Sequence, residues 1–511
     1  MAQKWWTLTA VSAGVFMLLL DVTIVNVALP DIEHALHASF SDLQWVINAY
    51  ALSLAALLLT AGSLADLLGR RRVFAIGVAI FTTGSLLCGL APSPLFLTIS
   101  RAGQGVGGAI MFATSLALLS NAFHGRERGV AFGVFGAITG IAVAVGPVLG
   151  GVITSGLTWR WIFLVNIPIG IATIAALLLR VEESRDPRAR RPDWLGFLTF
   201  SAALVALVYG LIETNTHGWG STTVIGSLVA AVVLLAAFVV VELLQREPMF
   251  DFALLRKPTF VGGLAAAFAI SAGLFALLTF LVLYLQNVLG YSAIQTGVRL
   301  LALTGAIFLT AGVAGRLSAH VPTRFLIGPG FALIGVGLLL MRGLTVDSDW
   351  THLLPGLIVA GFGAGLVNVP LASTAVGVVE PARAGMASGI NSTLRQVGIA
   401  TGIAALGSIF ASQLRSDVVA SLAGTPVGGH AHQLADAIVQ GQVSGAIASA
   451  PGPTRAVVAH AAQAGFVDGL NLILLVGAIV AFAGSALALT LIRQRDYVAV
   501  DGAMAGAPAP A

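Results

Sequence analysis

Fourteen apolar runs follow one another along this chain, and they constrain its fold more than any other feature. A helix needs about 20 apolar residues to cross the ~30 Å hydrocarbon core of a bilayer, whereas a membrane β-barrel shows alternating segments of about 10 residues. The chain is 57% hydrophobic and 9% charged over 511 residues, which excludes a soluble domain with its usual ~25% of charged residues. The sequence therefore predicts an all-α polytopic membrane protein with 14 transmembrane helices.

The runs also predict how the chain is divided. They cover 7–29, 45–65, 73–92, 95–120, 129–152, 161–180, 194–213, 222–243, 259–286, 294–315, 323–343, 351–374, 385–411 and 466–492. An arginine-rich link follows the sixth run and indicates a boundary there. We therefore expect an N-terminal six-helix half at 1–180, a linker with two inserted helices at 181–257, a C-terminal six-helix half at 258–492 with an extracellular loop at 412–464, and a disordered cytoplasmic tail at 493–511.

The basic residues predict the orientation in the membrane. An even number of spans places both termini on one side. Nineteen Lys and Arg residues then fall on the terminal side and four on the opposite side. Because positive charge concentrates on the cytoplasmic side, we expect a multi-pass protein of the cytoplasmic membrane with both termini in the cytoplasm. The basic residues thus report topology, and we expect no nucleic-acid partner.

A single carboxylate, Asp21, interrupts the first run. An ionised group inside a span costs at least ~2.5–3.5 kcal/mol on insertion scales, so we expect Asp21 to have a partner or a proton. The alternative is an Asp near the outer interface that only snorkels or caps, which Pro30 about nine residues later would allow.

Arg395 is a deep basic residue in run 385–411. It either binds an anionic group of a substrate or braces the second half. Asn26, Gln104 and Asn391 are further polar residues of the spans that we group with Arg395 as candidates for substrate binding or bracing.

The link between the second and third runs reads GSLADLLGRRR, residues 62–72. Glycines allow two helix ends to approach closely, and Asp66 can face the N-terminus of another helix or pair with a basic residue. We predict a gating loop that latches one of two arrangements of the halves. Its residues are Gly62, Asp66, Gly69, Arg70 and Arg71. The alternative is that the arginines only anchor the loop on the cytoplasmic side.

A faint copy of this loop, GRLSAHVPTR, stands at 315–324 with Ala319 in place of the aspartate. Repeated halves with a site between them are typical of secondary transporters. Run 129–152 carries glycines at small-x-x-small spacing together with Pro147. Gly140, Gly146, Pro147 and Gly150 predict close helix packing and a kink, which would shut a leak between the halves or serve packing alone.

These motifs resemble those of a known family. The loop at 62–72 is similar to the signature loop of the major facilitator superfamily. The segment LDVTIVNVALP in the first run resembles the first-helix motif of its fourteen-span drug:proton antiporters. RAGQGVGG in the fourth run, GPVLGG in the fifth and WRWIFLVNIPIG before the sixth are also similar to motifs of that family.

The resemblance implies two six-helix halves plus two inserted helices, and proton-coupled export of hydrophobic or cationic drugs by alternating access. It also implies that Arg101 takes part in proton coupling. Asp21 and Arg101 lie at similar depths in their runs, so a pair is sterically plausible. A nearby arginine lowers the pKa of a carboxyl group and burial raises it, so the distance within the pair decides whether the acid holds a proton.

Other functions stay open at this point. One alternative is a dedicated exporter of a single antibiotic, lipid or metabolite. Two alternatives of other classes are a nutrient importer or facilitator and a membrane-embedded enzyme. The enzyme would need a carboxylate cluster or a catalytic loop, and the sequence shows neither. We expect a secondary active transporter driven by the proton gradient, without cofactor or metal, whose partners are protons, membrane lipid and a small molecule, in the first place a lipophilic cation. A monomer is expected, and an adaptor protein is left open.

Overall fold

The structure of the protein is a computed structural model that describes residues 3–123, 125–185, 193–245, 248, 250–318, 320–379 and 384–497. Those residues form helices and connecting turns, without a β-strand among them. Eleven of the described helices are long and apolar enough to cross a membrane, and two shorter apolar helices accompany them. The predicted all-α fold class is confirmed. Each predicted run coincides with a helix or with consecutive helices, while the number that cross the membrane stays a prediction.

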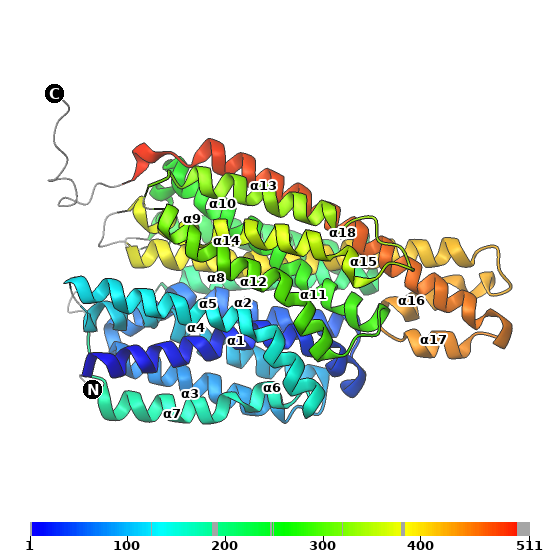
Figure 1. Ribbon diagram of the computed structural model, residues 1–511, viewed down its shortest axis with the longest axis horizontal. Helices are drawn as coiled ribbons and strands as arrows, with labels where there is room; N and C mark the ends of the chain where they lie inside the picture. Colours follow the sequence, from blue (N-terminus) through cyan, green and yellow to red (C-terminus); the bar gives the residue numbers. More distant parts are fainter. Residues whose placement is uncertain are drawn as a thin grey trace.

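One group of helices comes from the first third of the chain and packs mainly within itself, in the lower part of Figure 1. Its members are α1 (Gln3–Leu36), α2 (Phe40–Leu68), α3 (Arg70–Gly89), α4 (Pro94–Ala122), α5 (Gly125–Gly156), α6 (Trp161–Leu164) and α7 (Asn166–Arg180). We call this group the N-half.

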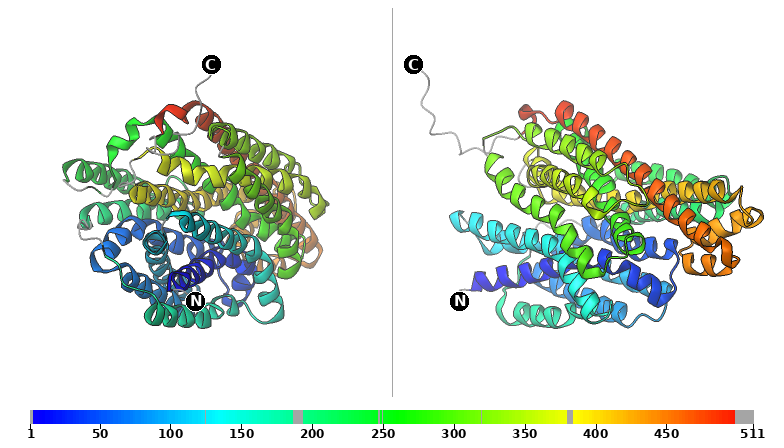
Figure 2. Two further views of the ribbon diagram at one scale, coloured as in Figure 1. Left: turned by 60° about the vertical axis from the view of Figure 1, so that its left-hand side comes forward. Right: turned by 45° about the vertical axis from the view of Figure 1, so that its right-hand side comes forward.

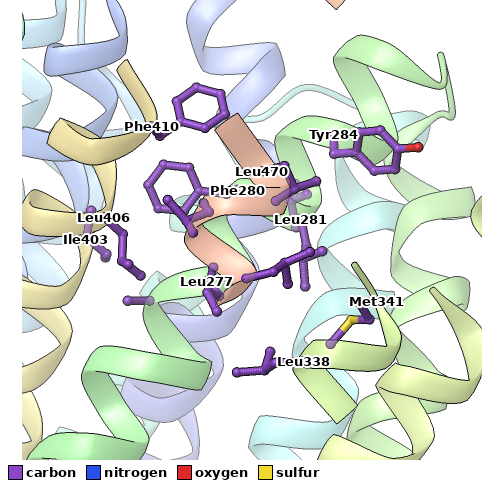
Figure 3. Packing of buried hydrophobic residues seen from close by; sticks show 14 of the residues in the cluster. Leu277, Phe280, Leu281, Tyr284, Leu338, Met341, Ile403, Leu406, Phe410 and Leu470 are labelled. Carbon is purple, nitrogen blue, oxygen red and sulfur yellow. The ribbon is translucent and has the colours of Figure 1, made fainter. Parts of the chain in front are cut away.

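The second group forms the upper part of the bundle in Figure 1. Its main members are α10 (Pro258–Ile270), α11 (Ala276–Leu283), α12 (Ala293–Leu317), α13 (Arg324–Leu340), α14 (Leu354–Gly377), α15 (Ala384–Leu422) and α18 (Arg455–Leu491). We call this group the C-half. Its core is built from large apolar side chains such as Phe280, Phe410 and Leu470 (Figure 3).

Two helices lie beside the seam between these halves. α8 (Trp194–His217) and α9 (Thr222–Leu244) form a hairpin that contacts α2 of the N-half and α15 of the C-half. A 3₁₀ turn, η1 (Phe252–Arg256), then leads into α10. The hairpin thus touches both halves.

The two ends of the bundle differ. α1 begins and α18 ends at one face, which we call the terminal face, and α16 (Ala431–Val439) and α17 (Val443–Ser449) extend from the other, which we call the loop face (Figures 1 and 2). The predicted loop 412–464 is largely helical, because α15 and α18 continue past the predicted span ends at 411 and 466. Apolar side chains of α16 pack into the C-half core and hold this extension in place.

Two predicted spans are not single α-helices. The span at 161–180 breaks at Val165 into α6 and α7. Pro168 explains the break, because proline has no N–H to donate to the carbonyl of Leu164 and its ring clashes with that carbonyl. The span at 259–286 contains two π-helical turns, Ser271–Phe275 and Tyr284–Val288, on either side of α11. Such turns locally widen a helix and are frequent at functional sites.

The halves meet closely near the loop face. Gln44, near the start of α2, donates a hydrogen bond of 3.0 Å to the carbonyl of Ile403 on α15. Gln286 donates one of 2.8 Å to the carbonyl of Val27 on α1. A Cβ on Gly297 of α12 would lie 2.3 Å from the carbonyl oxygen of Pro147 on α5, so the two helix backbones touch there. The described structure is therefore an arrangement in which the loop-face ends of the halves are packed together.

Candidate functional site

The polar centre of the N-half is built around Asp21, which lies in the middle of α1 and is only 1% exposed. Arg101 of α4 is 2% exposed, and its Nη1 lies 2.5 Å from Oδ2 of Asp21. A buried carboxylate without a partner would carry a large desolvation cost, which a buried ion pair offsets in part. The closeness of Asp21 and Arg101 expected from their depth is confirmed, and the interfacial alternative for Asp21 is excluded.

Gln104 links the two charges. One helical turn after Arg101 on α4, it accepts a hydrogen bond of 2.7 Å from Nη1 of Arg101. Its Nε2 donates to Oδ1 of Asp21 at 2.8 Å and also lies 2.7 Å from the hydroxyl of Ser85 on α3. Gln104 is fully buried within this network, and its predicted part in substrate binding or bracing stays a prediction.

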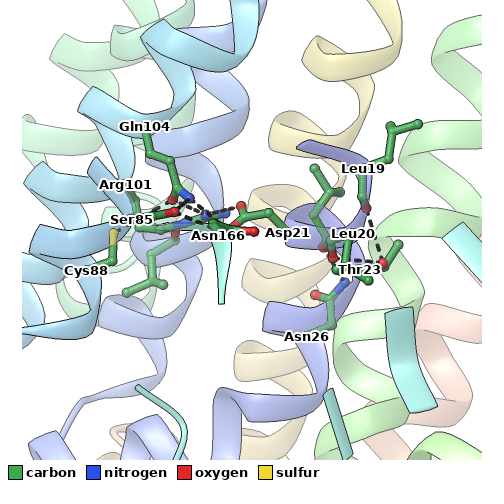
Figure 4. A network of polar contacts seen from close by, with 12 residues as sticks. Leu19, Leu20, Asp21, Thr23, Asn26, Ser85, Cys88, Arg101, Gln104 and Asn166 are labelled. Carbon is green, nitrogen blue, oxygen red and sulfur yellow. Dashed lines mark hydrogen bonds and ion pairs between the residues drawn. The ribbon is translucent and has the colours of Figure 1, made fainter. Parts of the chain in front are cut away.

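Asn166 completes the network from the first turn of α7 (Figure 4). Its Nδ2 lies 3.0 Å from the hydroxyl of Ser85 and 3.5 Å from Oδ1 of Asp21. The helix break before Asn166 allows this approach, because Asn166 begins a new helix instead of continuing the register of α6.

The remaining sides of Arg101 are also occupied. Its Nε donates a hydrogen bond of 3.3 Å to the carbonyl of Val46 on α2, and its guanidinium lies 4.2 Å from the ring centroid of Tyr50. A cation over an aromatic face gains electrostatic stabilisation that grows when the site is dry. Arg101 therefore ties α2 and α4 to α1.

This geometry suits one protonation state of Asp21. Two carboxylate oxygens receive donors from Arg101, Gln104 and Asn166, and an ionised carboxylate only accepts. A protonated Asp21 would bring its own donor into a ring of donors, so one of these contacts would have to break. The network joins α1 to α3, α4 and α7 around the Asp21 carboxylate.

Sequence reasoning missed Ser85 and Tyr50 as members of this site, because a serine or tyrosine in an apolar run carries no signal for its partner. Asn166 lies in the quoted segment WRWIFLVNIPIG, and Pro168 two residues later was the signal for the break that positions it.

Asn26 lies toward the loop face of α1 and contacts the other half. Its Oδ1 accepts a hydrogen bond of 3.3 Å from the hydroxyl of Thr279 on α11. Asn26 therefore connects the helix that carries Asp21 to the C-half.

The glycines and the proline of run 129–152, of which GPVLGG resembles a motif that marks the antiporters of the family, lie on α5. At Gly146 and Gly150 the backbone of α5 approaches Thr23 and Ile24 of α1, so closely that a Cβ on either glycine would overlap them. Pro147 faces α12 instead, where Gly297 meets its carbonyl oxygen. Gly140 lies on the same helix, two turns closer to the terminal face. The motif thus packs α5 against the Asp21 helix on one side and the C-half on the other.

The predicted gating loop is almost entirely helical. Gly62 and Asp66 lie in α2, Arg70 and Arg71 begin α3, and only Gly69 stands between the helices, with a φ of 111° that favours glycine. The side chain of Asp66 lies outside the described residues, so its predicted contacts stay a prediction.

A carboxylate that the sequence analysis did not consider, Glu183, holds this turn. It accepts hydrogen bonds from the backbone N–H groups of Arg71 at 3.0 Å and Arg72 at 3.2 Å. The N–H of Arg70 donates to the carbonyl of Ser184 at 2.9 Å. A carboxylate at a helix N-terminus is stabilised by the free N–H groups and the helix dipole. The start of the linker is thereby fixed to the turn between α2 and α3.

The structure places Arg395 and Asn391 on α15, apart from the Asp21 network. Arg395 is half-buried, and its Nη2 donates a hydrogen bond of 2.7 Å to Oδ1 of Asn368 on α14. Asn391 is 5% exposed.

Two groups of membrane helices that meet along a seam, with a buried ion pair inside one of them, define a polytopic membrane transporter built from paired helical halves. The comparisons with known proteins specify the family. The model of the Major Facilitator Superfamily matches residues 11–403, and the chain belongs to this family.

Its relatives agree with that assignment. The chain is 38% identical to "Multidrug resistance protein Stp" of Mycobacterium tuberculosis, over 92% of this chain and 88% of that protein. It is 35% identical to "Tetracenomycin C resistance and export protein" of Streptomyces glaucescens, over 95% and 91% of the two chains. A bacterial homolog of the lysosomal transporter Spinster, solved in an inward-facing and unoccupied conformation, shares the fold with a TM-score of 0.60 and 18% identity over 98% and 99% of the chains. These similarities place the chain among transporters rather than membrane-embedded enzymes.

Proposed function

We propose that this protein is a proton-coupled antiporter that exports apolar or amphipathic small molecules across the cytoplasmic membrane by alternating access. The observation that carries the proposal is the Asp21 network, in which a buried carboxylate of α1 is bonded to side chains of α4 and α7, and Ser85 of α3 joins through Gln104 and Asn166. The names of the relatives, a multidrug resistance protein and an antibiotic export protein, support export rather than import. The terminal face is the cytoplasmic face in this proposal, in keeping with its excess of basic residues.

The mechanism follows from the two protonation states. In the described arrangement, ionised Asp21 holds Arg101, and the halves are packed at the loop face. A proton that reaches Asp21 weakens its hold on Arg101 and Gln104, so that α4 and α1 can shift against each other. Because α1 contacts α11 through Asn26, such a shift passes to the seam between the halves. A proton driven by ~100 mV supplies ~2.3 kcal/mol, enough for a gradient of roughly 40-fold per proton.

A lipophilic cation as the substrate is a finer prediction of the sequence. Asp21 is the acidic residue in the middle of the predicted spans, and Arg101 already occupies it. A cation would therefore have to displace Arg101 or bind through apolar and aromatic contacts alone. The alternative of a dedicated exporter for one antibiotic, lipid or metabolite fits the same site.

The test is uptake of ethidium and of the anionic dye 1-pyrenebutyrate into inverted membrane vesicles with an imposed pH gradient. We expect gradient-driven uptake of at least one probe by the unchanged chain and its loss in Asp21→Asn. Asp468→Asn is the matched control, since Asp468 lies on the exposed surface of α18. Gradient-driven uptake that survives Asp21→Asn would remove Asp21 as the proton carrier.

A further inference from the structure

Two polar residues of α15 and one of α14 form a small group in the C-half. Asn391 and Arg395 are four residues apart on α15 and share a face of that helix. Nη2 of Arg395 donates a hydrogen bond of 2.7 Å to Oδ1 of Asn368 on α14. None of the three takes part in the Asp21 network.

This arginine differs from Arg101 in how its donors are used. Arg101 has a carboxylate, an amide and a carbonyl as acceptors. Arg395 has one amide, and among the described residues it has no acidic partner. The residue as a whole is half-buried, and the described structure gives its guanidinium this single hydrogen bond. A guanidinium has five N–H donors, and here one of them is used by a described residue.

A second polar group, four residues before Arg395 on the same helix face, has an atom without a partner. Asn391 is 5% exposed, and its Oδ1 is buried without a hydrogen bond in the described part of the chain. Buried polar atoms in folded proteins are nearly always hydrogen-bonded, so an unpaired oxygen on the same helix face as Arg395 leaves an acceptor for a ligand to use. A purely bracing arginine would be expected to have its donors satisfied by the protein.

The depth of the site limits its ligand. Arg395 lies eleven residues after Ala384, the first residue of α15, which is about 16 Å along a helix axis. That is close to the middle of a ~30 Å hydrocarbon core, far from the headgroups of either leaflet. The position favours a transported compound over a lipid headgroup, although both carry anionic oxygens.

We propose that Arg395, together with Asn391 and Asn368, binds an anionic oxygen, such as a carboxylate or sulfonate, on an apolar export substrate. The planar guanidinium matches a carboxylate bidentately, and Oδ1 of Asn391 accepts from a hydroxyl next to it. This inference rests on the proposed function only for the direction of transport, which is export. It does not depend on coupling to protons. The substrate class that it assigns is anionic, whereas the sequence predicted a lipophilic cation.

The test is equilibrium binding to the purified full chain in detergent, without any gradient. Three probes share one apolar body: 1-pyrenebutyrate is anionic, 1-pyrenebutanol neutral and 1-pyrenebutyltrimethylammonium cationic. Fluorescence anisotropy gives their affinities, with protein-free micelles as background. We expect the unchanged chain to bind the butyrate at least tenfold more tightly than the alcohol.

The variants separate recognition from folding. Arg395→Gln should weaken butyrate binding about tenfold to hundredfold and leave alcohol binding unchanged, because a hydrogen-bonded charge is lost. Arg395→Lys should keep part of the preference, since it retains the charge without the planar fork. Arg299→Gln is the control, because Arg299 belongs to the same half but stacks on Tyr291 at 3.6 Å near the loop face. Retained alcohol binding shows that each variant is folded.

Equal affinity for the butyrate and the alcohol in the unchanged chain would overturn the inference, as would an equal loss of all three probes in Arg395→Gln. The same measurement in nanodiscs of phosphatidylcholine, with and without phosphatidylglycerol, distinguishes the source of the anion. Competition by phosphatidylglycerol that disappears in Arg395→Gln would assign the site to a lipid headgroup and overturn its assignment to a substrate. Because binding requires no proton gradient, a failure of proton coupling in Asp21→Asn vesicles leaves this result unaffected.

Discussion

Replacing Gly297 with alanine should destabilise the packing of the halves at the loop face. A Cβ at this position would lie 2.3 Å from the carbonyl oxygen of Pro147, whereas ordinary contact begins at 3.4 Å. α5 and α12 must therefore separate by about 1 Å, and overpacking of this kind typically costs about 1–3 kcal/mol. Since 1.4 kcal/mol is a factor of ten, the described arrangement should lose roughly 5- to 150-fold in population against one with the loop-face ends apart.

The assay is labelling of a cysteine introduced at Ala293, which is 5% exposed at this contact in the described arrangement. The natural Cys88 is buried in the N-half and is replaced by alanine for a clean background. A membrane-impermeant maleimide then reports how often the contact opens. Gly297→Ala should raise the labelling rate several-fold or more.

Gly305→Ala provides the matched control on the same helix, because a Cβ there meets nothing within 4 Å. It should leave the labelling rate unchanged. Equal rates in both variants would refute the reasoning, since they would mean that close contact between α5 and α12 does not set the balance between arrangements.

Three further predictions concern stability. Asn166→Leu removes a donor from Ser85 and Asp21 and should cost about 1–3 kcal/mol in the free energy of unfolding, measured with denaturant; no loss would mean that Asn166 is dispensable to the network. Glu183→Gln should cost about 0.5–1 kcal/mol at low salt and less at high salt, because a charge at the N-terminus of α3 is screened; a loss that is independent of salt would contradict a charge effect. The hydroxyl and N–H of Thr259 donate to Asp496 and hold the pKa of that carboxyl below its ordinary 3.8, so its contribution to stability is present at neutral pH and is lost as pH falls through the lowered pKa. Thr259→Val should therefore reduce the acid-induced loss of stability in a thermal unfolding series, and an unchanged series would contradict this assignment.

The helices and the central pair could be predicted because their signals are local. A continuous apolar run fixes a spanning helix, and a charge within it needs a partner or a proton. The family resemblance singled out Arg101, and its similar depth then made a pair with Asp21 plausible. The rest depends on how each helix is rotated about its axis. Ser85 and Tyr50 face Gln104 and Arg101 only because α2, α3 and α4 pack in one particular register, and a single sequence does not contain that register.

The carboxylate that holds the turn between α2 and α3 could not be predicted for another reason. Glu183 is more than a hundred residues from Arg71, and it reaches Arg71 because α7 returns the chain to the terminal face. In the sequence it appears only as one charge in a solvated linker. The helical extension at the loop face was similarly hidden, since its small apolar residues resemble those of a loop.

The extensions of α15 and α18 beyond the predicted spans act as a lever at the loop face. Rigid helices carry any tilt of the C-half outward to α16 and α17, and the displacement grows with distance from the pivot. Gly441, next to α16, lies so close to Glu33 of α1 that an added Cβ would be 2.9 Å from its Oε1. Glu33 also accepts a hydrogen bond of 3.2 Å from Nδ2 of Asn287 in the C-half. An antibody fragment raised against this junction would bind one arrangement of the halves and not the other. Such a reagent would serve as a conformational sensor and, with the proposed orientation, as an inhibitor that acts without entering the cell.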